Sequence, residues 1–232
     1  MILVTGATGI VGRQTVAMLL GDGAQVAAVT RQGTTAALPT GAQVVTGDPS
    51  RPTTLIEALR GVDAVFLIPR AVGGATSELL ALAAKQGVRR VVVVSALTVQ
   101  YPAGYAHFAN EFRATEDAAR ASGLEWTILR CADFDANSLA WAPQIRSSGI
   151  VRGAYGAAAT SPIHERDIAA VGVRALLHFE HVGATYALTG PESLTQPDKV
   201  RLIGEAIGKE LSWQEISPEQ LRLGMLAQGL PA

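Results

Sequence analysis

A short apolar segment followed by three regularly spaced glycines constrains this chain more than any other stretch. Residues 2–4 are Ile-Leu-Val and predict a buried strand, and residues 5–12 read Thr-Gly-Ala-Thr-Gly-Ile-Val-Gly. Apolar residues at helical spacing follow, so the stretch predicts a strand, a glycine turn and a helix. In that context Gly6 permits a tight turn, Gly9 lets a pyrophosphate approach the backbone, and Gly12 lets the helix pack closely against the strand.

The N-terminus of this predicted helix offers free N–H groups and the positive end of the helix dipole to phosphates. The glycine spacing is G-x-x-G-x-x-G rather than G-x-G-x-x-G, and an ordinary glycine-rich strand–helix turn is the alternative. We predict that the turn binds a dinucleotide through the three glycines and the residues next to them: Gly6, Thr8, Gly9, Ile10, Val11 and Gly12.

Length and composition narrow the class of protein. The chain has 232 residues, enough for a single domain with a core at about 1–132 and a smaller lobe at about 133–232. The net charge of −1 gives no basic balance for nucleic acid, and one cysteine excludes a disulfide framework and a multi-cysteine metal site. Without a basic leader or an apolar run of about 18–20 residues, we expect a cytoplasmic protein with no metal and no membrane partner.

Alternating strand and helix patterns up to residue 130 predict an α/β fold with a doubly wound parallel sheet. The pattern then changes to shorter pieces, which predict a small C-terminal α+β lobe that binds the substrate. The predicted strands are 2–4, 25–30, 42–46, 64–69, 91–96, 126–130, 185–188 and 212–216. The predicted helices are 76–86, 107–122, 138–145, one that starts near Asp167 and ends near residue 177, 196–207 and one from residue 218.

Two charged residues follow the second and third predicted strands. Arg31 lies 19 residues after Gly12, where an acidic residue would favour NAD and an arginine can pair with the 2′-phosphate of NADP. The alternative is a solvated loop arginine. Asp48 either accepts a hydrogen bond from the adenine amino group or caps the next helical turn.

The next strand ends are expected near the nicotinamide half of the cofactor, because open α/β sheets bind ligands at the carboxyl ends of their strands. Ile68 and Pro69 end the fourth strand, and Ser95 stands at the end of the fifth. The glycines at 73 and 74 predict a flexible loop that could act as a flap.

Several motifs together resemble the NmrA-like branch of the atypical short-chain dehydrogenase/reductases. They are the glycine motif at 5–12, Ser-Gly-Leu-Glu-Trp-Thr-Ile-Leu-Arg at 122–130, Arg-Asp-Ile-Ala at 166–169 and Leu-Thr-Gly-Pro at 188–191. The resemblance implies a Rossmann core that binds NADP(H). Some members reduce quinones, azo dyes or other small acceptors, and others are redox-sensing regulators without turnover.

The chain departs from the wider superfamily at the catalytic site. Most catalytic members use Tyr-x-x-x-Lys, but here Tyr105 is followed four residues later by Ala109, and no lysine occurs between Lys85 and Lys199. Hydride transfer from a reduced nicotinamide to a quinone can proceed with a weak acid, because the cofactor carries the difficult step. We expect Tyr105 or His107 to supply that acid. A helix-start residue bonded to backbone is the alternative for His107.

The substrate pocket is expected to include Cys131, which stands where the family usually has proline, as a small apolar residue. Phe134, Trp141 and Tyr155 are candidates for the pocket wall, with core packing as the alternative for each.

These features predict an NADP(H)-dependent oxidoreductase that transfers hydride to a small apolar quinone or carbonyl acceptor. The alternative is a non-catalytic NADP(H)-binding redox sensor that acts through a protein partner. A sugar-nucleotide epimerase is disfavoured by the missing Tyr-x-x-x-Lys. A homodimer is the default expectation for the oligomeric state.

Overall fold

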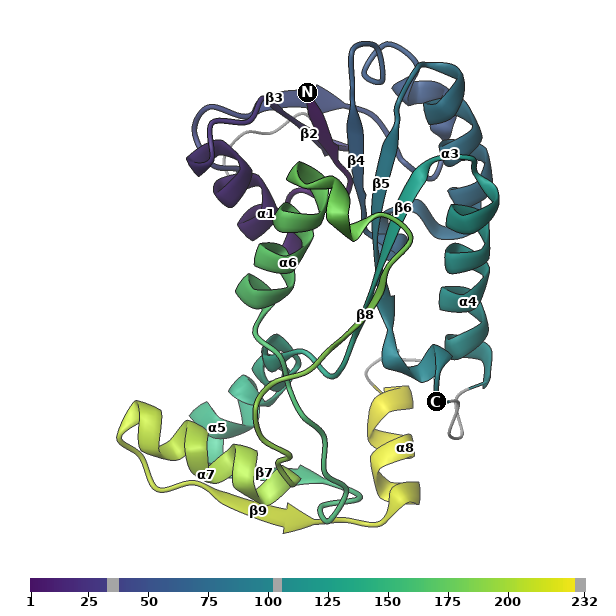
Figure 1. Cartoon of the computed structure of the whole chain (residues 1–232). Helices are drawn as coiled ribbons and strands as arrows, with labels where there is room; N and C mark the ends of the chain where they lie inside the picture. Colours follow the sequence, from purple (N-terminus) through teal and green to yellow (C-terminus); the bar gives the residue numbers. More distant parts are fainter. Residues whose placement is uncertain (33–37, 102–105, 228–232) are drawn as a thin grey trace. The chain divides into compact units, whose positions relative to one another are not determined.

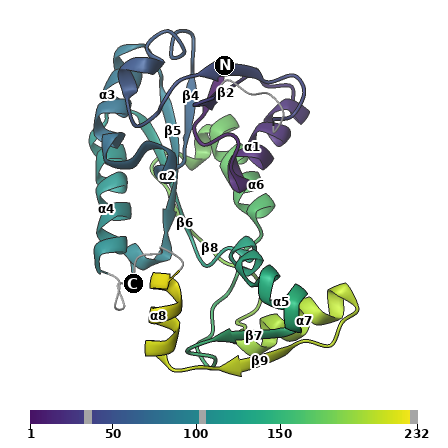
Figure 2. The same cartoon turned by 180° about the vertical axis from the view of Figure 1, so that it is seen from behind.

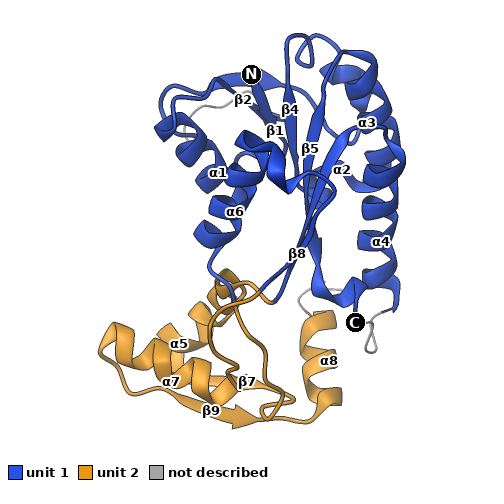
Figure 3. Ribbon diagram, in the orientation of Figure 1, with its two compact units in different colours: residues 1–132, 163–188 blue, residues 133–162, 189–232 orange. Residues whose placement is uncertain are grey.

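The computed structural model describes residues 1–32, 38–101 and 106–227, which form two compact units (Figure 3). The first unit comprises Met1–Ala132 and Ile163–Leu188, and the second comprises Asp133–Pro162 and Thr189–Ala232. The chain therefore leaves the first unit at residue 132, returns to it at residue 163 and leaves it again at residue 188.

The first unit is built on a seven-stranded parallel sheet with the strand order β3-β2-β1-β4-β5-β6-β8 (Figure 1). This arrangement confirms the predicted doubly wound α/β fold. The strands are β1 (Ile2–Val4), β2 (Val26–Thr30), β3 (Gln43–Thr46), β4 (Ala64–Leu67), β5 (Arg90–Ala96), β6 (Glu125–Cys131) and β8 (Thr185–Leu188).

Helices cover both faces of this sheet, as the two opposite views show (Figures 1 and 2). On one face α1 (Ile10–Gly21) lies against α6 (Glu165–Leu177), and on the other α3 (Thr76–Lys85) lies against α4 (Ala106–Ala121). Because both faces are covered, strands β1, β2 and β4 are buried along their whole length and consist almost entirely of apolar residues. Short helices complete the unit: η1 (Pro52–Leu55), α2 (Pro69–Val72), η2 (Gly73–Ala75), η3 (Leu97–Val99) and η5 (Phe179–His181).

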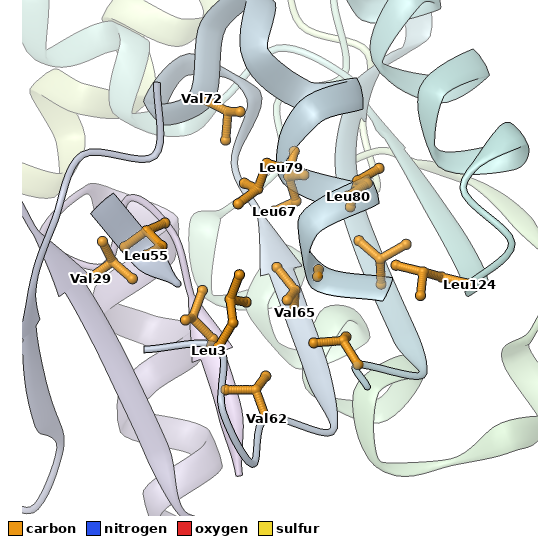
Figure 4. Close-up of a cluster of buried hydrophobic side chains, with 14 of the residues drawn as sticks. Leu3, Val29, Leu55, Val62, Val65, Leu67, Val72, Leu79, Leu80 and Leu124 are labelled. Carbon is orange, nitrogen blue, oxygen red and sulfur yellow. The ribbon is translucent and has the colours of Figure 1, made fainter. Parts of the chain in front are cut away.

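The main hydrophobic cluster of the first unit fills the space between the sheet and the helices that follow β4 (Figure 4). Leu3, Val65 and Leu67 come from adjacent strands and are fully buried, as are Leu79 and Leu80 of α3. This core fixes the edge of the sheet at which the strands β1, β4 and β5 end.

The second unit contains a small parallel pair, β7 (Ile150–Gly153) with β9 (Ser212–Glu215). A capping box between Thr195 and Asp198 starts its helix α7. The remaining helices are η4 (Asp135–Trp141), α5 (Ala142–Ser148), α7 (Gln196–Ile207) and α8 (Pro218–Ala227). A partly buried ion pair links three segments of this unit: Lys199 Nζ lies 2.9 Å from Asp133 Oδ2 and donates to Thr160 Oγ1 at 2.7 Å.

The structure corrects three expectations. Residues 163–188, which the sequence placed in the lobe, belong to the first unit, because β8 pairs with β6 and α6 packs on the sheet. The segment after Ile68 forms the short helices α2 and η2 rather than a flexible loop. The glycine-rich stretch at 149–159 contains the unpredicted strand β7, which pairs with a strand about 60 residues further along the chain.

Candidate functional site

The glycine turn adopts the geometry that its sequence requires. Gly6 has a φ of +59°, a conformation that L-residues with a side chain rarely adopt. The carbonyl of Gly6 accepts a hydrogen bond from Gly9 N–H at 2.9 Å, which closes the turn. Gly9 is the N-cap residue of α1 and provides no side-chain cap. The turn between strand and helix is therefore built entirely from backbone.

Gly12 allows α1 to lie against this turn without a gap. A Cβ atom at Gly12 would lie 2.2 Å from Gly6 O and 2.9 Å from Ala7 Cα, which are both backbone atoms. A Cβ at Gly6 would in turn lie 3.1 Å from the Cβ of Ile68, at the end of β4. The turn is thus clamped between the start of α1 and the end of the neighbouring strand.

The start of α1 presents hydrogen-bond donors to solvent. The first N–H groups of a helix lack partners within the helix, and Thr8, Gly9 and Ile10 are exposed. The first turn of α1 contains no acidic residue that would neutralise the positive end of the dipole. These residues fit the pyrophosphate of a dinucleotide, which would lie over Gly9 and accept hydrogen bonds from the backbone.

Thr5, which was not among the predicted site residues, positions the turn. Thr5 is fully buried, and its N–H donates to Phe66 O at 3.0 Å. Its Oγ1 accepts a hydrogen bond from Ile68 N–H at 2.8 Å. Thr5 therefore fixes the end of β4, and with it Ile68 and Pro69, relative to the glycine turn.

Arg31 and Asp48 lie beside each other at the ends of β2 and β3. Arg31 is exposed and directly follows Thr30, whose carbonyl accepts a hydrogen bond from Gly47 N–H at 3.0 Å. Asp48 Oδ1 accepts from Ser50 N–H at 3.0 Å and from Ser50 Oγ at 2.7 Å. Asp48 therefore closes the turn at residues 48–50, but it does not cap the next helical turn as one of its predicted roles required, because η1 has Arg51 as its N-cap residue and no side-chain cap. The Oδ2 atom of Asp48 is outside the two bonds from Ser50.

The end of β5 is occupied by a buried charge network that local sequence patterns do not reveal. Glu116 of α4 has no exposed surface, and its Oε1 accepts hydrogen bonds from Ser95 Oγ at 2.7 Å and Arg130 Nε at 2.9 Å. Its Oε2 accepts from Arg130 Nη2 at 2.8 Å and Arg120 Nη2 at 2.9 Å. Burial disfavours the charge of Glu116, but these hydrogen bonds outweigh it and lower the pKa of the carboxyl below its usual value.

This network occupies the hydroxyl group of Ser95, which was predicted to contact the cofactor. The side chain of Ser95 is buried and its hydroxyl hydrogen is committed to Glu116. Ser95 contributes to the site by linking the ends of β5 and β6 to α4, and any proton that it donates goes to Glu116.

The two predicted acids are placed differently. Tyr105 lies outside the described residues. His107 is in the first turn of α4, with 92% of its side chain exposed, and its Nε2 lies 3.2 Å from Glu111 Oε1 one turn further on. A nearby hydroxyl was not singled out by the sequence: Thr98 Oγ1, in η3 just after β5, is buried without a hydrogen-bond partner in the part of the chain that the structure describes.

The four predicted pocket residues divide between the two units. Cys131 ends β6 in the first unit, and burial raises the pKa of its thiol to about 12, so the group is protonated at neutral pH. Phe134, Trp141 and Tyr155 belong to the second unit, where the ring of Trp141 contacts that of Trp213 at 6.1 Å between centroids. Tyr155 is exposed and has a φ of +61°.

The described residues contain neither a membrane-spanning helix nor a metal-binding cluster. No helix among them has the length and hydropathy needed to cross a bilayer. No group of three or more histidine, cysteine, aspartate or glutamate side chains among them is arranged to hold a metal ion.

Comparison with known proteins adds to this geometry. A family model described as NAD(P)H-binding matches residues 6–179, a span that includes the glycine turn and most of the first unit. The chain belongs to the NAD(P)H-binding family. Within it, the likeness to a solved NADPH-dependent quinone oxidoreductase places the chain in the NmrA-like group of the atypical short-chain dehydrogenase/reductases.

Two relatives that match the whole chain are named as reductases. The chain is 39% identical to the (4-alkanoyl-5-oxo-2,5-dihydrofuran-3-yl)methyl phosphate reductase of Streptomyces griseus and 30% identical to the NAD(P)H azoreductase of Xenophilus azovorans. Each alignment covers 100% of this chain and 82% of the relative. The crystal structure of the Escherichia coli quinone oxidoreductase QOR2 complexed with NADPH is 27% identical, with a TM-score of 0.85 over 100% of this chain and 84% of that one. The family match therefore indicates NAD(P)H as the cofactor, and the glycine turn has the geometry that fits its pyrophosphate.

Proposed function

We propose that this protein is an NADP(H)-dependent oxidoreductase that transfers hydride to a small apolar quinone or other conjugated carbonyl acceptor. The observation that carries the proposal is the backbone cradle formed by Gly6, Gly9 and the start of α1, closed by the close approach of Gly12 to Gly6. The cofactor supplies the hydride when bound. The chain binds the pyrophosphate at α1 and holds the ends of β4 and β5 in place through Thr5 and Glu116.

The named substrates of the relatives support this class of acceptor. They are an unsaturated lactone with an acyl group and a phosphate, an azo compound and a quinone. In each of these compounds a conjugated system spreads the negative charge that arrives with a hydride. Such an acceptor needs less help from a strong acid than an isolated ketone does, which agrees with the absence of a Tyr-x-x-x-Lys sequence at Tyr105.

Consumption of NADPH by the purified protein tests this function. We expect the absorbance of NADPH to fall in the presence of at least one member of a panel of quinones, acylated unsaturated lactones and small ketones, and to fall faster with the conjugated members. Binding of NADPH is measured in parallel by fluorescence. Tight binding of NADPH without turnover of any compound in the panel would contradict the proposed enzymatic function and favour a redox sensor.

Replacing Arg31 tests the choice of cofactor. Arg31→Asp removes a cation and adds an anion where we expect the 2′-phosphate, so the dissociation constant for NADPH should rise roughly 10- to 100-fold, the size of one or two lost charge-assisted hydrogen bonds. The dissociation constant for NADH should change little or improve. Equal losses for the two cofactors would remove Arg31 from the phosphate site.

A further inference from the structure

The turn after β3 carries a second arginine, Arg51, and β3 pairs with β2, the strand that Arg31 follows. Arg51 N–H donates to Asp48 O at 2.8 Å, while Ser50 holds Asp48 Oδ1 through two hydrogen bonds. The backbone of residues 48–51 is therefore fixed by its own hydrogen bonds, and it carries the Arg51 side chain outward at a defined point near the end of β3.

The guanidinium of Arg51 is available to a ligand. Its Nε lies 3.9 Å from Asp48 Oδ2, which is too long for a hydrogen bond, and 79% of the side chain is exposed. Arg31 and Asp48 follow neighbouring positions at the paired ends of β2 and β3, because Gly47 N–H donates to Thr30 O. The hydrogen bonds from Ser50 chiefly lower the pKa of Asp48, and the charges of Arg51 and Arg31 lower it further.

We propose that Arg31 and Arg51 together form the binding site for the 2′-phosphate of NADP(H). The inference rests on the proposed cofactor and extends it to a residue that the sequence did not suggest. Two guanidiniums and one carboxylate leave a local charge of +1, which favours a phosphate dianion, whereas Asp48 alone would repel it. A planar guanidinium can also bind two oxygens of one phosphate, and two arginines can reach different edges of the group.

The test is Arg51→Ala, with Arg60→Ala as the matched control. Arg60 is also an exposed arginine, nine residues further along, and is paired with Glu57 at 2.9 Å instead of with Asp48. Dissociation constants are measured by titration for NADPH and NADH, and for adenosine 2′,5′-bisphosphate and AMP, which differ in the 2′-phosphate alone. We expect Arg51→Ala to weaken NADPH and the bisphosphate about tenfold, to leave NADH and AMP unchanged, and Arg60→Ala to alter none of them.

Two results would overturn the inference. An equal loss of affinity for NADPH and NADH would assign Arg51 to a part of the cofactor that the two share, and unchanged dissociation constants for both would give it no role. The second result, in a protein whose wild type prefers NADPH, leaves the proposed function intact and removes the role of Arg51 alone. A wild type without that preference overturns both. Thermal melting of Arg51→Ala checks that the variant is folded, as expected for an exposed side chain.

Discussion

Glu116→Ala should destabilise the protein by about 3–5 kcal/mol, which is the usual cost of removing one partner of a buried ion pair. The carboxylate accepts four hydrogen bonds from three side chains and has no exposed surface. Without it, Arg130, whose side chain is only 18% exposed, keeps its charge and loses its partner. Unfolding by urea at about pH 7 measures the loss as a shift of the transition midpoint.

The matched control is Asp117→Ala, one residue further along the same helix. Asp117 also pairs with Arg120, but 66% of its side chain is exposed, so the loss should stay within about 1 kcal/mol. A similar small loss for Glu116→Ala would contradict the structural role of the network.

The effect of Glu116 should depend on pH in a defined direction. Because the pKa of Glu116 is lower in the folded protein than its usual 4.5, its stabilisation is present in full above that value and is lost as the pH falls through the folded pKa. The difference in unfolding free energy between wild type and Glu116→Ala should therefore be constant near neutrality and shrink in acid. A difference that grows as the pH falls would contradict the assigned sign.

Gly12→Ala should abolish tight NADPH binding. The new Cβ would lie 2.2 Å from Gly6 O, so the start of α1 must move away from the glycine turn. Because the pyrophosphate depends on donors from both elements, we expect the dissociation constant for NADPH to rise more than tenfold and the unfolding free energy to fall by about 1–3 kcal/mol.

The control for this substitution lies in the same helix. A Cβ at Gly21, the last residue of α1, meets no atom within 4 Å. Gly21→Ala should therefore leave NADPH binding unchanged, and stability unchanged or slightly raised. Equal binding by Gly12→Ala and Gly21→Ala would show that close contact between α1 and the turn is not required for the cofactor.

Elements with a strong local signal could be predicted from the sequence. Strand β1 and the glycine turn have an apolar run and fixed spacing, and α7 begins and ends where Gln196 and Ile207 were expected, because Thr195 caps it and Gly208 ends it. The backbone geometry of Gly6 and Gly12 follows from the same spacing. These features need only neighbouring residues to be specified.

Features that depend on distant partners could not be predicted in this way. Glu116 occurs in a helix rich in charges, and its burial depends on Ser95, 21 residues before it, and Arg130, 14 residues after it. Strand β7 is four residues long and depends on β9 for its pairing. From the sequence alone, Asp48 can be interpreted as a helix cap. That Arg31 and Asp48 follow neighbouring strand ends depends on the pairing of β2 with β3, which the local sequence does not specify.

The return of residues 163–188 to the first unit has a consequence for synthesis on the ribosome. When residue 132 has emerged, β6 has no neighbour on its outer edge, and the sheet face that receives α6 is bare at Phe66, against which Gly172 will lie. The face at Phe66 stays bare until α6 has been made, and the edge of β6 stays open until β8 has been made. The nascent sheet must therefore wait, with an open edge, while the first segment of the second unit is made, and α1, among the first parts synthesised, gains its packing against α6 only afterwards.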